Sequence, residues 1–357
     1  MRILEKGSFP FAVYRLPGED TVKVLIDRSE DLHVVNDANT DRGFVFAPFA
    51  SDTLPSVLLR AGATTCLPVS SLPDVASREK GGSGAVADFA DARAKERYES
   101  LVSKALNALD EGTLKKIVVS RRMELSGARV DMAALFSALA ARHPGAFVYC
   151  FSHPQIGRWA GASPELLLLR RGGQLRTMAL AGTLPYQGEQ LYRWDRKNVE
   201  EQALVSVFIK DALEKSGAAA VSVSRPGNQL AGPVVHLCSR IEGRIPDGLD
   251  MNALLKNLAP TPALCGYPRR EAMEFLRSYE GYPREFYGGY LGELNLAAAD
   301  TAELYVNIRC LQMTPEGVFL YAGGGIVPGS EPESEWEETV RKLSAVAPLV
   351  LQHSARS

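Results

Sequence analysis

The first 75 residues alternate between short apolar runs and turn-forming residues. The apolar runs are bounded by Gly, Asp and Pro and cover residues 11–16, 21–27, 31–35 and 43–49. Such short runs between turn residues are typical of β-strands. Residues 71–90 concentrate Ser, Gly and charge, which predicts a loop or linker. We therefore expect a strand-rich N-terminal elaboration over residues 1–90, packed on a catalytic domain over residues 91–357.

Beyond residue 91, helical and strand-like patterns alternate. Apolar residues recur at near-helical spacing from Asp91 to a stop at Gly112. Further helices are predicted over residues 131–142, about 196–216, about 248–258 and after Pro332. Strand-like runs cover residues 114–125, 146–151 and 166–180. This alternation predicts an α+β (layered α/β) fold, with large antiparallel or mixed sheets and helices packed outside them.

Residues 305–342 carry the richest chemistry of the chain. Residues 303–312 and the apolar run 318–322 flank a turn and predict a hairpin. The second run continues into three glycines, Gly323–Gly325. At a strand end, glycine N–H groups without ladder partners can hold an anion, although such glycines can also form only a bulge.

The predicted helix after Pro332 presents charged residues on one face. Glu335, Glu338 and Lys342 are spaced i, i+3 and i+7, which places them on the same side of a helix. Two carboxylates and an ammonium in this arrangement could hold a divalent cation together with a substrate carboxylate. A solvated surface face has the same spacing, so the pattern leaves both interpretations open.

Other polar residues lie within or beside apolar runs. Lys115 and Lys116 begin a strand, so only one of them can face the interior, and the pattern does not decide which. Glu165 precedes an apolar strand; burial would raise its pKa and make it a proton donor near neutrality, whereas at the surface it would only begin the strand. His236 lies within an apolar strand, where it is either a core residue or a hydrogen-bond partner of a substrate hydroxyl.

Composition narrows the class of protein. The 357 residues carry a net charge of −2 with both signs interspersed, which argues against nucleic acid or a membrane surface as partner and favours a small-molecule substrate. Five cysteines without CxxC spacing disfavour zinc and fit thiols in a reducing cytosol. No apolar run approaches the roughly 20 residues of a membrane span. We therefore expect a cytoplasmic protein.

Nine segments, taken in order, resemble the chorismate-utilising enzymes, the family of isochorismate synthase, salicylate synthase and the large components of anthranilate and aminodeoxychorismate synthases. The resemblance covers about residues 90–345. The segments are KIVVSR, GASPELL, ALAGT, KNVEEQALV, HLCSRIEG, APTPALCGYP, YVNIR, AGGGIVPGS and EWEETVRK. The resemblance implies layered antiparallel sheets with flanking helices, a deep site between them, chorismate as substrate and Mg²⁺ as cofactor.

The resemblance also implies roles for individual residues. The implied metal ligands are Glu201, Glu335 and Glu338, although the neighbouring Glu200 leaves open which of the two acids faces the metal. Arg309, the backbone around Gly323 and Gly324, and Lys342 resemble a clamp on the enolpyruvyl carboxylate. Other positions that match the pocket lining are Gly182, His236, Ala263 and Leu264.

The group that attacks the ring distinguishes the members of the family. Ala181 stands where aminodeoxychorismate-forming relatives have a lysine, and anthranilate synthases lack the lysine that matches Lys116. Lys116 thus resembles a general base that takes a proton from water attacking C2, while Glu165 resembles the acid that protonates the departing C4 hydroxyl.

The expected protein is a Mg²⁺-dependent isochorismate synthase, an isomerase that feeds menaquinone or siderophore biosynthesis and needs no amidotransferase subunit. Salicylate synthase, which also eliminates pyruvate, is an alternative. An anthranilate synthase-type component that requires an amidotransferase is another, and Lys116 argues against it.

Overall fold

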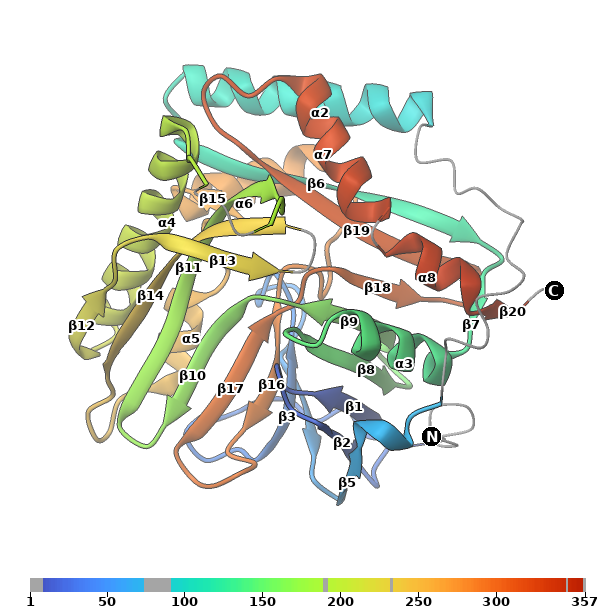
Figure 1. Ribbon diagram of the computed structural model, residues 1–357. Helices are drawn as coiled ribbons and strands as arrows, with labels where there is room; N and C mark the ends of the chain where they lie inside the picture. Colours follow the sequence, from blue (N-terminus) through green and yellow to red (C-terminus); the bar gives the residue numbers. More distant parts are fainter. Residues whose placement is uncertain (1–8, 74–90, 189–191, 232–233, 345, 356–357) are drawn as a thin grey trace.

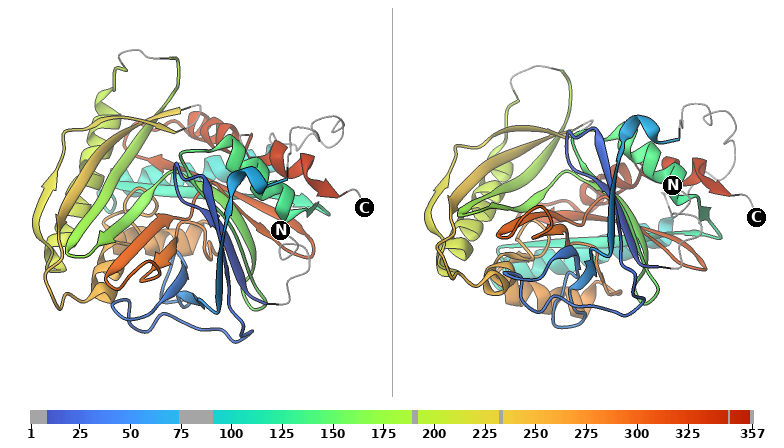
Figure 2. Two further views of the ribbon diagram at one scale, coloured as in Figure 1. Left: turned by 60° about the horizontal axis from the view of Figure 1, so that its bottom comes forward. Right: turned by 90° about the horizontal axis from the view of Figure 1, so that it is seen from below.

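Two large antiparallel sheets form the framework of the protein (Figures 1 and 2). The computed structural model describes residues 9–73, 91–188, 192–231, 234–344 and 346–355. Every strand pair within the two sheets is antiparallel. Helices cover the sheets from outside, so the predicted α+β fold with large antiparallel sheets and flanking helices is confirmed.

Sheet A runs from β15 and β6 across the top of Figure 1 and down its right side, and it combines strands from the N-terminal and C-terminal parts of the chain. In spatial order its strands are β15 (Gly266–Tyr267), β6 (Lys116–Ser126), β19 (Gly317–Ile326), β18 (Cys310–Met313), β9 (Gly157–Ser163), β8 (Phe147–His153), β1 (Phe11–Arg15), β2 (Thr21–Ile26) and β5 (Ala63–Pro68). A separate short pair is formed by β7 (Arg129–Val130) and β20 (Ser354–Ala355).

Sheet B lies on the left of Figure 1. Its strands in spatial order are β12 (Ala219–Val223), β14 (Val234–Arg244), β11 (Gln174–Pro185), β10 (Leu166–Arg171), β17 (Thr301–Val306), β16 (Tyr290–Leu294), β3 (Gly43–Ala47) and β4 (Val57–Arg60), and β13 (Gly227–Ala231) also pairs with β14. The N-terminal strands therefore extend both sheets. The division at residue 90 stays a prediction, and residues 74–90 of the predicted linker lie outside the described part of the chain.

Seven α-helices of the described chain pack around the sheets (Figure 1). They are α2 (Ala92–Asp110), α3 (Met132–Arg142), α4 (Arg196–Lys215), α5 (Met251–Leu258), α6 (Arg269–Tyr279), α7 (Pro332–Ser344) and α8 (Ala347–Gln352), with a 3₁₀ turn η1 over Val69–Ser71. All five predicted helices are present. Helix α6 was not predicted, although its buried residues Ala272, Phe275 and Leu276 follow helical spacing. None of the described helices combines the length and the apolar character that a membrane span needs.

Aromatic side chains from both sheets fill the space between them. The rings of Phe147 on β8 and Tyr305 on β17 stack with their centroids 4.5 Å apart. Phe46 on β3 stacks on Phe286 at 4.4 Å. Large rings remove much apolar area from water, so these contacts hold the two sheets against each other.

The chain passes twice between the sheets at one place. Residues 303–312, predicted as one strand, are two: β17 ends in sheet B at Val306, and β18 begins in sheet A at Cys310. The chain also leaves β9 in sheet A and enters β10 in sheet B across Pro164 and Glu165. The N–H of Val306 donates to the carbonyl of Glu165 at 2.9 Å, so the two crossings lie side by side. This seam places Glu165 and Arg309 between the sheets.

Two further sequence expectations differ from the structure. Residues 166–180 do not form one run, because Arg171 and Gln174 pair across a tight turn between β10 and β11. Gly323–Gly325 lie near the end of β19 as expected, but they pair with residues 118–120 of β6 and are not without ladder partners. The hairpin predicted around residue 315 is present as β18 and β19.

Candidate functional site

A cavity of about 290 Å³ lies at the seam of the two sheets, bounded by α4 and α7. This volume is near the lower end of the range for small-molecule sites. Twelve of the thirteen predicted site residues line it: Lys116, Glu165, Gly182, Glu201, His236, Ala263, Leu264, Arg309, Gly323, Glu335, Glu338 and Lys342. Only Gly324 is absent from the lining. Residues that lie far apart in the sequence are thus brought to one place.

The two lysines that begin β6 point in opposite directions, as the alternation of a strand requires. Lys115 is exposed, and its ammonium lies over the ring of Tyr267. Lys116 is 1% exposed, and its Nζ lies 2.7 Å from Oε1 of Glu201. The structure therefore resolves which lysine faces the interior.

Glu165 is a buried carboxyl group at the crossing from β9 to β10, and 5% of the residue is exposed. Burial raises the pKa of Glu165 to about 7, because a charged carboxylate loses its hydration there, while Lys116 and Arg309 act in the opposite direction. Glu165 is then partly protonated at neutral pH. A carboxyl group in this state can act as a proton donor.

Arg309 lies at the second crossing, where its backbone φ is 50°. Its Nη2 donates to Nε2 of His236 at 3.2 Å, and Nδ1 of His236 donates to the carbonyl of Gly182 at 3.0 Å. A guanidinium is only a donor, so Nε2 must accept and the proton of His236 must lie on Nδ1. Burial, and then the charge of Arg309, lower the pKa of His236 to about 4. His236 is therefore a neutral residue that orients Arg309.

Gly182 lies in a bulge of β11, where the pairing with β14 shifts between Ala181 and Thr183. Its φ is 73°, in the region that favours glycine. A Cβ at this position would lie 2.6 Å from Oδ1 of Asn198 on α4. Glycine is thus needed for α4 to approach the sheet, which carries Glu201 to the cavity.

The three predicted metal ligands come from α4 and α7, and each is paired with a lysine. Lys116 contacts Glu201 at 2.7 Å, Lys342 contacts Glu338 at 2.6 Å and Lys197 contacts Glu335 at 3.4 Å. Among the described residues, no three His, Cys, Asp or Glu side chains gather closely enough to hold a metal ion.

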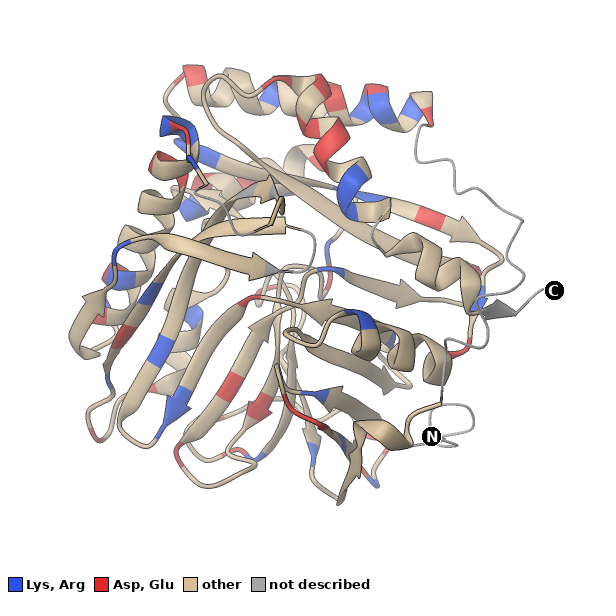
Figure 3. Ribbon diagram, in the orientation of Figure 1, with Lys and Arg blue, Asp and Glu red and all other residues tan. Residues whose placement is uncertain are grey.

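The environments of these acids differ. Burial raises the pKa of Glu335, whereas the ammonium of Lys342 lowers the pKa of Glu338. Helix α7 carries acidic residues in its first turn and basic residues in its last turn (Figure 3). Glu200 is exposed and pairs with Arg196, so Glu201 is the acid of this pair that reaches the cavity.

The glycines of β19 alternate between two environments. Gly323 and Gly325 line the cavity, and Nζ of Lys342 donates to the carbonyl of Gly323 at 2.7 Å. A Cβ on Gly325 would lie 2.7 Å from Oε1 of Glu201. A Cβ on Gly324 would lie 3.0 Å from Oε2 of Glu335 and 3.2 Å from the hydroxyl of Tyr98. The proposed contact of the Gly324 backbone with substrate stays a prediction.

Several lining residues were not predicted. Lys197 lies four residues before Glu201 and thus on the same face of α4, so helical spacing could have identified it. Tyr287 also lines the cavity, and its ring stacks on that of Tyr321 with the centroids 5.1 Å apart. Tyr287 follows the segment after α6 and carried no sequence pattern that points to a site.

Comparison with known proteins gives consistent matches. A family profile described as chorismate binding enzyme matches residues 73–350. The chain is 33% identical over 266 residues to the salicylate biosynthesis isochorismate synthase of Pseudomonas aeruginosa. The aligned region covers 72% of this chain and 55% of that protein. It is 30% identical over 258 residues to the isochorismate synthase EntC of Escherichia coli. This aligned region covers 70% of this chain and 66% of that protein.

A solved structure extends the similarity over nearly the whole chain. The menaquinone-specific isochorismate synthase MenF of Escherichia coli superposes with a TM-score of 0.79 and 25% identity, covering 98% of this chain and 90% of that one. The sequence matches above span less than two thirds of the length of either curated relative.

Proposed function

Because the chain belongs to the chorismate-binding enzyme family, we propose that it is an isochorismate synthase, an isomerase that converts chorismate reversibly to isochorismate. Similar proteins bear this name, including the relatives from Pseudomonas aeruginosa and Escherichia coli. The observation that carries the proposal is that Lys116 and Glu165, a base and an acid in type, are both buried on one cavity wall that also holds Arg309.

Each of these residues has a distinct task in the proposed reaction. Arg309 binds a substrate carboxylate, for which its planar guanidinium provides two parallel donors. Lys116, in its uncharged amine form, takes a proton from the water that attacks C2 of the ring. Glu165 gives its proton to the C4 hydroxyl, which leaves as water. The carboxyl pKa of about 7 supplies the protonated form that this step needs.

A bound Mg²⁺ is part of the proposal, and the chemistry of three acids of the site fits it, although their carboxylates do not converge on one point in this structure. Glu201, Glu335 and Glu338 offer the hard oxygen ligands that Mg²⁺ prefers. Each is held by a lysine, so the ion would compete with three ammonium groups for these carboxylates. When bound, the ion would supply positive charge for the ring carboxylate of chorismate. The protein residues would still orient the substrate and move both protons.

A product assay tests the proposal. Purified protein is incubated with chorismate and Mg²⁺, with and without ammonium, and the products are separated by chromatography. We expect isochorismate, and the same equilibrium mixture when the reaction begins from isochorismate. Salicylate with pyruvate would instead indicate a salicylate synthase, and ammonium-dependent anthranilate an anthranilate synthase-type component. No conversion of chorismate would refute the enzymatic assignment.

A matched pair of variants tests the base. Lys116→Gln removes the buried ammonium, whereas Lys115→Gln makes the same change at the exposed neighbour. We expect kcat to fall about 10²- to 10⁴-fold for Lys116→Gln, the usual contribution of a general base, and to stay near that of the parent protein for Lys115→Gln. Equal kcat values in the two variants would contradict the role of Lys116.

A further inference from the structure

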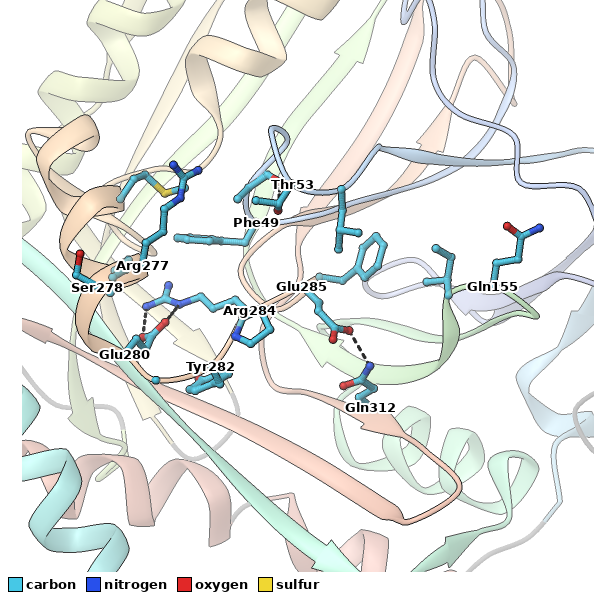
Figure 4. Close-up of a pocket in the computed structure, with 18 residues that line it drawn as sticks. Phe49, Thr53, Gln155, Arg277, Ser278, Glu280, Tyr282, Arg284, Glu285 and Gln312 are labelled. Atoms are coloured by element: carbon cyan, nitrogen blue, oxygen red, sulfur yellow. Dashed lines mark hydrogen bonds and ion pairs between the residues drawn. The ribbon is translucent and has the colours of Figure 1, made fainter.

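A second cavity, of about 930 Å³, shares no lining residue with the candidate active site (Figure 4). It is formed by the end of α6, the segment that follows it, the loop after β3, the turn between β8 and β9, and one residue of β18. Much of its wall is apolar, with Phe49, Leu54, Ile156, Leu276 and Phe286. A volume of this size with an apolar wall and a few polar groups is typical of a small-molecule site.

The charges of this cavity leave one carboxylate uncompensated. Glu280 and Arg284 form a buried pair with two hydrogen bonds, of 2.7 and 2.6 Å. Arg277 pairs with Asp52 at the rim. Glu285 contacts no cation among the described residues, and its Oε2 accepts only from Nε2 of Gln312, at 2.8 Å (Figure 4). The charged lining residues, Arg277, Glu280, Arg284 and Glu285, sum to zero, and Glu285 is the one lining carboxylate that has no ion pair among the described residues.

The apolar wall and the carboxylate of Glu285 together select for one kind of ligand. A protonated amine would form a charge-assisted hydrogen bond with the carboxylate of Glu285, which is stronger than a bond between neutral groups. An aromatic or aliphatic body would cover Phe49 and Phe286. An anion would instead meet an unbalanced carboxylate, and like charges repel.

Two hydrogen-bond chains connect this cavity to the candidate active site. Gln312, which holds Glu285, accepts from the hydroxyl of Tyr321 at 2.7 Å, and the ring of Tyr321 lines the active-site cavity. Arg284 donates to the carbonyls of Val118 and Leu264 at 2.6 and 2.7 Å, and both of these residues line the same cavity. A ligand on Glu285 would compete with Gln312 for the carboxylate and so act on Tyr321.

We propose that this cavity binds a small molecule with an apolar or aromatic body and one protonated amine, and that occupancy alters the active site through Glu285, Gln312 and Tyr321. The binding is independent of the reaction. The coupling rests on the proposed function, because its effect is read on chorismate turnover.

Three probes of matched shape test the binding: 2-phenylethylamine, 2-phenylethanol and 3-phenylpropanoate, titrated into the full chain by calorimetry at pH 7. We expect the amine to bind most tightly. Glu285→Gln keeps the shape and the acceptor for Gln312 but removes the charge, so it should weaken amine binding about tenfold, the value of a charged hydrogen bond. Glu274→Gln, an exposed change on α6 outside the cavity, should have no effect.

Each outcome decides one of the two claims. Equal affinity for the three probes, or unchanged amine binding by Glu285→Gln, would overturn the site.

The coupling is tested with Tyr321→Phe, which keeps the stacked ring but removes the hydroxyl that donates a hydrogen bond to Gln312. We expect the amine to change the KM for chorismate in the parent protein and to bind the Tyr321→Phe variant without that change. An equal change of KM in both proteins would overturn the coupling, and binding without any turnover of chorismate would refute the proposed function but not the site.

Discussion

The substitution Glu165→Gln separates the stability of the protein from its activity. Glutamine has nearly the shape of a protonated glutamate but cannot ionise. The carboxyl group of Glu165 has an ordinary pKa of 4.5 and a pKa of about 7 in the folded protein, because it is buried. Between these two values the folded state binds more protons than the unfolded state, so stability falls as the pH rises through this window.

The size of the effect follows from the two pKa values. Each pH unit between them corresponds to about 1.4 kcal/mol, so an ionised Glu165 destabilises the folded protein by about 3 kcal/mol above pH 7. Glu165→Gln removes this cost. Below pH 4.5 the carboxyl group is protonated in both states and the cost is absent.

Urea unfolding of both proteins at pH 5 and pH 8 measures this difference. We expect the stability of Glu165→Gln relative to the parent protein to increase by about 2–3 kcal/mol between these two values of pH. The same variant should lose turnover of chorismate, because it cannot donate a proton. A stability difference that does not change with pH would show that Glu165 ionises normally, and the role of Glu165 as proton donor at neutral pH would then be refuted.

Three further predictions concern the same cavity. Glu338→Gln should raise the concentration of Mg²⁺ needed for half-maximal turnover about 10- to 100-fold, whereas Glu337→Gln, an exposed change one residue earlier, should leave it unchanged. His236 should stay neutral with its proton on Nδ1 from pH 5.5 to pH 9, which ¹⁵N NMR of the ring would show; a midpoint near 6.5 would contradict its pairing with Arg309. Gly325→Ala should lower turnover about 10- to 100-fold by displacing the carboxylate of Glu201, with circular dichroism as the check on folding, and unchanged turnover would contradict the predicted displacement.

Sequence patterns predicted the elements of this fold better than their connections. Helix α4 was predicted within one residue, because its apolar positions repeat regularly and Asp195 caps its first turn. Residues 303–312 were taken as one strand, since the apolar pattern continues through Val306 and Cys310 although they belong to different sheets. Periodicity reports that a residue is buried but not which sheet it joins, and so the seam that forms the site was not predicted.

The candidate site was predicted from ordered motifs, whereas its internal pairing was not. Alternation along β6 required one of Lys115 and Lys116 to face inward, but the choice depends on which side of β6 faces the cavity and α4. The contact between Lys116 and Glu201 joins residues from different elements, and no local spacing encodes it. Lys197 is the exception, because its position four residues before Glu201 was available in the sequence.

The charges that face the active-site cavity balance before any ligand is bound. Its cations are Lys116, Lys197, Arg309 and Lys342, and its carboxylates other than Glu165 are Asp195, Glu201, Glu335 and Glu338. With Glu165 and Lys116 both protonated, the state before Lys116 acts as a base, these charges sum to zero. Chorismate with both carboxylates ionised adds two negative charges, and Mg²⁺ adds two positive ones. Either one alone would leave a net charge in a partly desolvated site, where it is costly, whereas the two together restore neutrality. The proposed site is thus suited to a dianion and a divalent cation bound as a pair.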